Sequence, residues 1–471
     1  MRTVILSDLH LGNAQGYDIF AGETALPAFL DSLAGSPTRV VLNGDTVDFL
    51  MNEDPLELQV ERAVRQVRAL VSAPSTAAVF ASLGRLLAAG GEVIACLGNH
   101  DIELALSEVQ AVLREALRQP PEIAARFLFN RGDAPELLDV GGARLLIAHG
   151  DHGDKWNKVE YAHLPGPGAP ADARAEDYKY SAGSVLVKKL LNPLKRRYGM
   201  RFADLLVPDF QGAVMAALAV NPSAVRLLFQ NTTFDILWQL FRKSQLPLTF
   251  DPNAPGEEDL GLAAKVDEAG LDEEERRELE EVMGPSPVSF GGDETELSQR
   301  TRIKLVRAAL GAYARMQRLF VGQSGERYFS LKPTEAETKD ARRLAKKFGA
   351  GAVIIGHTHA ARWKEDAEVL YANSGTWIWL VRLPSPEASD SVWADFLEEL
   401  RNNPGLEPQR QRLAKLETRF NAVVAEPHPD GGAEVSLVEW MPSQGALRRL
   451  ATTRVAASLN DRAPDPTRRN A

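Results

Sequence analysis

Short apolar runs of strand length alternate with amphipathic segments over the first 150 residues. The runs are rich in β-branched residues and predict strands, whereas residues 23–34 carry apolar side chains at helical spacing. By the same criteria we predict strands over 3–6, 39–42 and 93–97, helices over 56–71, 76–89 and 109–117, and a hairpin over 136–148 that turns at two adjacent glycines. Strands that alternate with helices indicate a layered α/β core.

The pattern changes from about residue 155, where strands give way to helical segments. These are predicted over 184–191, 202–206, 211–220, 224–229, 233–241 and 302–319, with an acidic and flexible connection over 251–300. Strands resume at 352–355 and are predicted again over 368–372, 377–381, 422–425 and 434–440, with a helical stretch over 391–420. We therefore expect a core in two parts, 1–155 and 346–450, a helical insertion over 156–345 that acts as a lid, and a disordered tail over 451–471.

The composition excludes few classes of protein. Hydrophobic residues make up 44% and charged residues 25%, as in ordinary globular proteins. The net charge of −10 disfavours a long nucleic-acid duplex as partner, because duplex binding depends on basic surface. The single cysteine, Cys96, excludes an intramolecular disulfide, and the N-terminus lacks the features of a signal peptide. No apolar run reaches the roughly 18 residues of a membrane span, so we expect a cytoplasmic location. The sequence gives no indication of the oligomeric state.

One basic segment, 188–197, combines lysine and arginine with leucine. Such a segment is compatible with peripheral contact to a membrane surface or with binding of an anionic substrate. The interpretation we favour is a solvated helix face over a buried apolar stripe.

Five of the predicted strands are followed at once by Asp, Asn or His. The five blocks are Asp8-Leu9-His10, Gly44-Asp45-Thr46-Val47-Asp48, Gly98-Asn99-His100-Asp101, His149-Gly150-Asp151 and Gly356-His357-Thr358-His359. Asp8 and His10 are two residues apart, so in extended geometry their side chains share one face. The potential metal ligands are Asp8, His10, Asp45, Asn99, His149, His357 and His359.

This donor set mixes nitrogen and oxygen and contains no thiolate, which suits Mn, Fe or Zn, with Mn favoured. Its size indicates two divalent ions, which can activate a bridging water and clamp a phosphoryl group. A leaving oxygen still needs a proton. His100 is placed to supply it, and we expect Asp101 to fix the tautomer of His100 and raise its pKa.

The five blocks, present in this order, resemble those of the calcineurin-like metallophosphoesterases. The resemblance covers about 1–155 and 345–380 and implies a four-layer α/β/β/α sandwich. By position it implies one ion on Asp8, His10 and His359, a second on Asn99, His149 and His357, and Asp45 bridging the two. It also implies His100 near the leaving group, with Asp48 behind the ligands or capping a helix.

The resemblance implies hydrolysis of a phosphodiester or pyrophosphate bond by a metal-bridging hydroxide, in a small-molecule or nucleotide-containing phosphoester. Two alternatives stay within the superfamily. The blocks at Asp8 and Asn99 are also similar to those of Mre11/SbcD-type nucleases. Residues 7–12 and 371–377 resemble the UDP-2,3-diacylglucosamine hydrolases, whose better-known members carry Arg at the position of His100. A third alternative is a metal-binding scaffold with vestigial catalysis, against which the intact ligand set argues.

Overall fold

A computed structural model describes most of the two core parts and a portion of the insertion. The described residues are 1–12, 18–154, 157–165, 178–205, 217, 219–221, 271–277, 298–307, 331–382, 384, 388–407, 410–413 and 415–458. The helices predicted over 224–229 and 233–241 lie outside them, as do most of the helix predicted over 211–220 and most of the acidic connection. Within that connection, residues 273–277 are helical.

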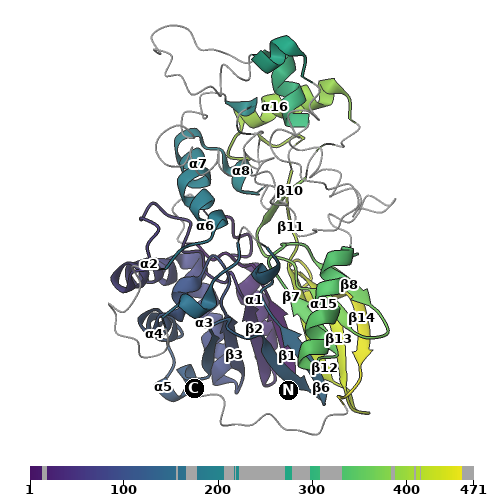
Figure 1. Ribbon diagram of the computed structural model, residues 1–471. Coiled ribbons are helices and arrows are strands. Elements are labelled where there is room, and N and C mark those ends of the chain that lie inside the picture. Colours follow the sequence, from purple (N-terminus) through teal and green to yellow (C-terminus); the bar gives the residue numbers. More distant parts are fainter. Residues whose placement is uncertain are drawn as a thin grey trace.

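The first sheet joins the two ends of the chain (Figure 1). Its order is β14 (Ala446–Val455), β13 (Ala433–Met441), β12 (Asn421–Pro427), β1 (Arg2–Leu6), β2 (Thr38–Asn43), β3 (Glu92–Cys96) and β4 (Phe127–Asn130). Strands β1 to β4 are parallel, whereas β12 runs antiparallel to β1. The carboxyl ends of β1, β2 and β3 therefore meet at one edge of the sheet.

The second sheet combines a hairpin from the first core part with strands from the second. Its order is β5 (Glu136–Val140), β6 (Ala143–Ile147), β7 (Ala352–Ile355), β9 (Leu370–Asn373) and β8 (Arg362–Glu365). The predicted β5–β6 hairpin is present, and it turns at Gly141 and Gly142, both of which have positive φ. Because β6 and β7 are parallel, their carboxyl ends also lie side by side.

Three layers of buried side chains hold four layers of structure together. Apolar residues such as Ile5 and Ile354 form a core between the two sheets. The outer face of the first sheet is covered by α1 (Ala25–Leu33), α2 (Val60–Ser72), α3 (Pro74–Ala88), α4 (Ser107–Ala116) and α5 (Pro121–Ala124). The outer face of the second sheet is covered by α15 (Glu335–Phe348). This arrangement confirms the predicted α/β/β/α sandwich.

Two of the predicted boundaries are wrong. Helix α15 begins at Glu335, inside the range predicted for the insertion, yet it packs on the core. The tail predicted as disordered begins inside β14, which continues to Val455 and pairs with β13 along its length. This strand is polar because it lies at the sheet edge, where Arg449 reaches Glu434 across the ladder at 3.1 Å. Residues 459–471 lie outside the described part.

The first part of the insertion contacts the core directly. Helices α6 (Ala182–Leu186) and α7 (Asn192–Tyr198) are joined by a π-helical turn over Val187–Leu191, and α8 (Arg201–Leu205) follows. Three side chains of the basic segment contact residues 51–53. Lys188 bonds to Asn52, Lys195 lies 2.9 Å from the Met51 sulfur, and Arg196 pairs with Glu53. These three basic side chains therefore contact the core instead of forming a fully solvated face.

Helix α16 (Asp390–Asn402) occupies the first part of the stretch predicted as helical over 391–420, and β11 (Lys415–Thr418) occupies its end. Strand β11 pairs with β10 (Trp379–Arg382) in a separate two-stranded sheet. Among the described helices none is by itself long and apolar enough to cross a membrane. Helices α2 and α3, bent by 87° at their junction, meet the criterion of length and composition only as a pair.

Candidate metal centre

All seven predicted ligands follow the carboxyl ends of strands in the two sheets. Asp8 and His10 follow β1, Asp45 follows β2, Asn99 follows β3, His149 follows β6, and His357 and His359 follow β7. Their donor atoms converge in two neighbouring groups, one of Asp8, His10 and His359 and the other of Asp45, His149 and His357. The structure thus brings together residues from position 8 to position 359.

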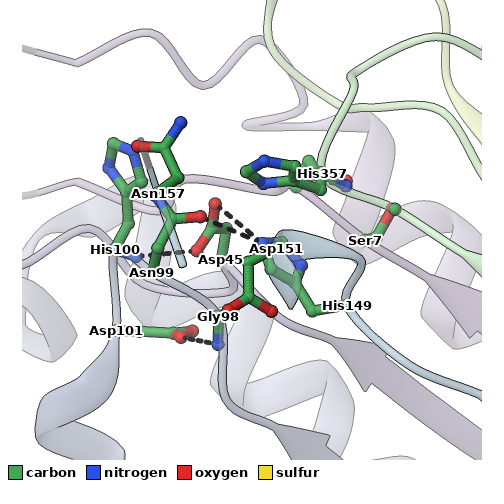
Figure 2. A network of polar contacts seen from close by, with 12 residues as sticks. Ser7, Asp45, Gly98, Asn99, His100, Asp101, His149, Asp151, Asn157 and His357 are labelled. Atoms are coloured by element: carbon green, nitrogen blue, oxygen red, sulfur yellow. Dashed lines mark hydrogen bonds and ion pairs between the residues drawn. The ribbon is translucent and has the colours of Figure 1, made fainter. Parts of the chain in front are cut away.

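Asp45 belongs to the second group and also approaches the first. Its Oδ2 is 3.3 Å from Nε2 of His149 in one group and 3.9 Å from Nε2 of His10 in the other. Asn99, which belongs to neither three-residue group, places its Oδ1 3.3 Å from Nε2 of His149 (Figure 2). The Asp45 carboxylate therefore approaches donor atoms of both groups.

Five of the ligands adopt left-handed backbone conformations. Asp8, His10, Asp45, His357 and His359 have φ between 47° and 68°, and they make up five of the seven non-glycine residues with positive φ in the described part. The expected extended geometry of Asp8 and His10 is therefore wrong. Such conformations are disfavoured for residues with a side chain and collect at functional sites, where the surrounding structure imposes them.

Two glycines of the motifs provide the space that the carboxylate ligands occupy. A Cβ atom on Gly98 would lie 2.3 Å from Oδ1 of Asp45, and one on Gly356 would lie 2.7 Å from Oδ2 of Asp8. Both contacts are shorter than real Cβ atoms show. The glycines therefore permit the close approach of the strand ends that brings the ligands together.

Hydrogen bonds from behind the ligands set the histidine tautomers. Nδ1 of His149 lies 3.1 Å from the carbonyl of Asn43, and Nδ1 of His10 lies 2.8 Å from Oδ2 of Asp48. Both partners only accept, so Nδ1 carries the proton and the Nε2 lone pair faces the site. Nε2 of His10 then lies 3.2 Å from Nε2 of His359. Two imidazole nitrogens this close together suit a divalent cation between them.

The pKa values of the predicted ligands shift in both directions. Burial lowers the pKa of His149, but the charge of Asp45 outweighs it and raises that pKa well above its ordinary value. Burial raises the pKa of Asp8, and the neighbouring Asp45 adds to this rise. Burial alone would raise the pKa of Asp45, but His149 and His100 outweigh it and lower that pKa well below its ordinary value. Burial and the nearby His10 lower the pKa of His359 well below its ordinary value, which leaves a neutral imidazole able to bind a metal.

His100 contacts a different carboxylate from the one predicted. Its Nδ1 lies 3.0 Å from Oδ2 of Asp48, the same oxygen that accepts from His10. Asp101 points away from the ring and accepts from the backbone N–H groups of Gly98 and Thr46 (Figure 2). The prediction that Asp101 holds the His100 ring is therefore wrong, because the turn at Gly98 directs that carboxylate into the loop. Burial raises the pKa of Asp101 to about 7, and the charge of Asp45 adds to the effect.

Residues 151–154 also contribute to the surroundings of the site. Asp151 accepts from the Val159 amide and the Tyr161 hydroxyl, so it fixes its own loop. Asp154 Oδ2 lies 3.0 Å from Nε2 of His357 and accepts from Asn157. His152 pairs with Asp340 on α15 instead of joining the ligands.

Residues 1–200 match the family model described as calcineurin-like phosphoesterase. Over these residues the chain is a calcineurin-like phosphoesterase. It is accordingly a metal-dependent phosphoric ester hydrolase, and its His and Asp groups provide for binding of divalent metal. A comparison with curated proteins finds no match.

Sequence reasoning missed the roles of Asp48 and Asp154 in this phosphoesterase. Asp48 is in a predicted block, three residues after Asp45, and this spacing offered only a choice between a supporting residue and a helix cap. Asp154 contacts a histidine more than 200 positions away in the sequence, and no local pattern indicates that contact.

Proposed function

We propose that this phosphoesterase holds two divalent ions and hydrolyses a phosphodiester or pyrophosphate bond. The observation that carries the proposal is the approach of the Asp45 carboxylate to donor atoms of both groups. Asp8, His10 and His359 would hold one ion, and Asn99, His149 and His357 the other. Mn is favoured, and Fe or Zn fits the same donors. Bound ions would supply a water of lowered pKa and neutralise charge on the phosphoryl oxygens.

His100 is proposed as the proton donor to the leaving oxygen. Asp48 holds Nδ1 of His100, so Nε2 is the nitrogen that would carry the transferable proton. The His100 side chain is 13% exposed, whereas those of His10 and His149 are 1% exposed, so a substrate oxygen has access to it. Asp48 fixes the orientation of the ring and stabilises its protonated form by charge.

The first experiment tests the bridging carboxylate. Turnover of bis-p-nitrophenyl phosphate with Mn²⁺ is measured for the wild type and for Asp45→Ala, and bound metal is quantified in both. Asp45→Ala is expected to lose turnover together with bound metal, because both donor groups share this residue. The exposed Asp139 provides a control, since Asp139→Ala removes a carboxylate far from the ligands. Undiminished turnover in Asp45→Ala would contradict the proposal.

The second experiment tests proton donation. His100→Ala is expected to lower turnover by about 10²–10⁴-fold on a diester with an alkoxide leaving group. The loss is expected to be much smaller on bis-p-nitrophenyl phosphate, because nitrophenolate barely needs a proton. His428→Ala, in the loop between β12 and β13, is the control. Equal losses of turnover on the two substrates would remove His100 from the donor role.

A further inference from the structure

The insertion contacts the core at the loop that follows Asp48. Asn192, at the start of α7, donates from Nδ2 to the carbonyls of Leu50 at 2.7 Å and Asn52 at 2.9 Å. Lys188 donates from Nζ to the carbonyl of Asn52 at 3.0 Å and to the Asn52 side chain. Two side chains of the insertion therefore bind one short turn of the core, residues 50–52.

The same turn is also hydrogen-bonded to Asp48, which contacts the His100 ring. Asp48 Oδ1 accepts from the amides of Leu50 at 2.9 Å and Met51 at 3.1 Å, while its Oδ2 holds the His100 ring. The amide of Phe49 donates to the carbonyl of His100 at 3.1 Å. A continuous set of hydrogen bonds thus runs from α7 through residues 50–52 to both the ring and the backbone of His100.

The local helix geometry supports a specific role for the two side chains. Lys188 lies in the π-helical turn, and Asn192 is the first residue after that turn, four positions beyond Lys188. Both side chains donate to Asn52. Leu190 and Leu191, 1% and 0% exposed, anchor the turn against apolar neighbours. Single π-helical turns are uncommon and occur frequently at functional sites. Burial lowers the pKa of Lys188 to about 8, and the charges of Asp48 and Glu103 face its ammonium group.

We propose that Asn192 and Lys188 are positioning residues for His100. By fixing the turn at 50–52 they fix Asp48, and Asp48 in turn directs Nε2 of His100 toward the leaving oxygen. The inference rests on the proposed function, in which His100 donates the proton. In this proposal the described part of the insertion holds the proton donor in position through the turn at 50–52. This role differs from the lid that the sequence predicts.

A substitution of Asn192 distinguishes a positioning role from direct contact with substrate. It is 3% exposed, and its Nδ2 is occupied by two carbonyls, so it acts only through the turn that it binds. Lys188 is only half-buried. The substitution Asn192→Leu is therefore the more informative one, and Lys188→Met provides a second variant if Asn192→Leu does not fold.

The experiment measures kcat and bound Mn²⁺ for each variant on two substrates, an alkyl phosphodiester and bis-p-nitrophenyl phosphate. Asn192→Leu and Lys188→Met are each expected to lower kcat on the alkyl diester by about 10- to 100-fold, as misplacement of a catalytic group does. The loss on bis-p-nitrophenyl phosphate is expected to be several-fold smaller. Because Asp48 also holds the predicted ligand His10, kcat and metal content are compared at saturating Mn²⁺, where metal content is expected to be unchanged. Lys188→Arg is expected to restore part of the loss, and the neighbouring exposed Lys189→Met serves as control.

A double-variant cycle completes the test. In the His100→Ala background, Asn192→Leu is expected to cause no further loss on the alkyl diester, because residues that act through one group are not additive. Equal losses on both substrates, or full additivity in this background, would overturn the inference. If His100→Ala depends on the leaving group and Asn192→Leu does not, only the positioning role fails. If His100→Ala itself shows no dependence, the donor role fails and this inference fails with it.

Discussion

At the scale of single residues, Asp154 contacts the predicted ligand His357. Its carboxylate accepts from Nε2 of His357 at 3.0 Å, so this nitrogen carries the proton and Nδ1 retains the lone pair that a cation needs. Asn157 donates to the same carboxylate oxygen at 2.7 Å and limits its movement. Asp154 is therefore expected to set the orientation of a ligand that it does not join.

The first prediction is that Asp154→Ala weakens metal binding by about 10- to 100-fold, the usual effect of losing a partner of a ligating histidine. The dependence of activity on Mn²⁺ concentration measures it. Asp340→Ala is a matched control, because Asp340 also pairs with a histidine, His152, and that histidine is not a predicted ligand. An unchanged Mn²⁺ requirement in Asp154→Ala would show that His357 needs no such partner.

The sequence predicted residue identities better than residue contacts. The seven ligands were predicted because each one lies within a few residues of the end of an apolar run, and this pattern is local. Asp101 was paired with His100 because the two are adjacent, yet the chain turns between them and Asp48 takes that place. The left-handed backbone conformations of the predicted ligands could not be predicted from the sequence either, because the packing of distant segments imposes them.

At the scale of secondary structure, buried elements were predictable and exposed ones were not. Strand β7 was found at its observed bounds because all four of its residues are apolar and buried. Strand β14 has mostly exposed or half-buried residues, and β8 (Arg362–Glu365) is largely polar, so neither has the alternation that indicates a strand. Each pairs antiparallel with the adjacent strand in the chain, β14 with β13 and β8 with β9. The partner strands were predicted, but the polar residues of β14 and β8 give no strand pattern of their own.

Tyr180 of the insertion contacts Glu103, a core carboxyl group with a shifted pKa. Glu103 lies in the short helix Ile102–Ala105 and is 5% exposed, and the Tyr180 hydroxyl donates to its Oε1 at 3.0 Å. Burial raises the pKa of Glu103 to about 7, with Tyr180 and Lys188 opposing the rise and Asp101 adding to it. Ionisation of this carboxyl therefore occurs at higher pH in the folded chain than in the unfolded chain.

The second prediction concerns the pH dependence of stability. The folded state retains the Glu103 proton between about pH 4.5 and pH 7, so this group makes the unfolding free energy fall as pH rises through that window, by up to about 3 kcal/mol. Glu103→Gln removes the titration. Its stability relative to the wild type is thus expected to be higher at pH 8 than at pH 5, as measured by urea unfolding at both pH values. A difference independent of pH would contradict the raised pKa.

At the scale of the whole molecule, the site is where the two parts of the core meet. The Asp8 carboxylate accepts from the backbone N–H of His357 at 3.0 and 2.9 Å, and its carbonyl accepts from the Thr376 hydroxyl at 2.8 Å. Ser7 bonds to Ser374 at 2.7 Å. Both sheets supply ligands, so separation of either part of the core from the other dismantles the centre.

The last prediction follows from this placement. Since the donors converge only in the folded chain, bound metal stabilises the fold by mass action, with about 2.7 kcal/mol expected at a free metal concentration 100 times the Kd. Chelation with EDTA is expected to lower the Tm by on the order of 5 °C, and excess Mn²⁺ to restore it. Asp45→Ala, which lacks the shared ligand, is expected to show a much smaller response to either treatment, whereas the exposed variant Asp139→Ala responds like the wild type. A wild-type Tm that EDTA and Mn²⁺ both leave unchanged would mean that the convergence of these side chains does not couple metal binding to folding.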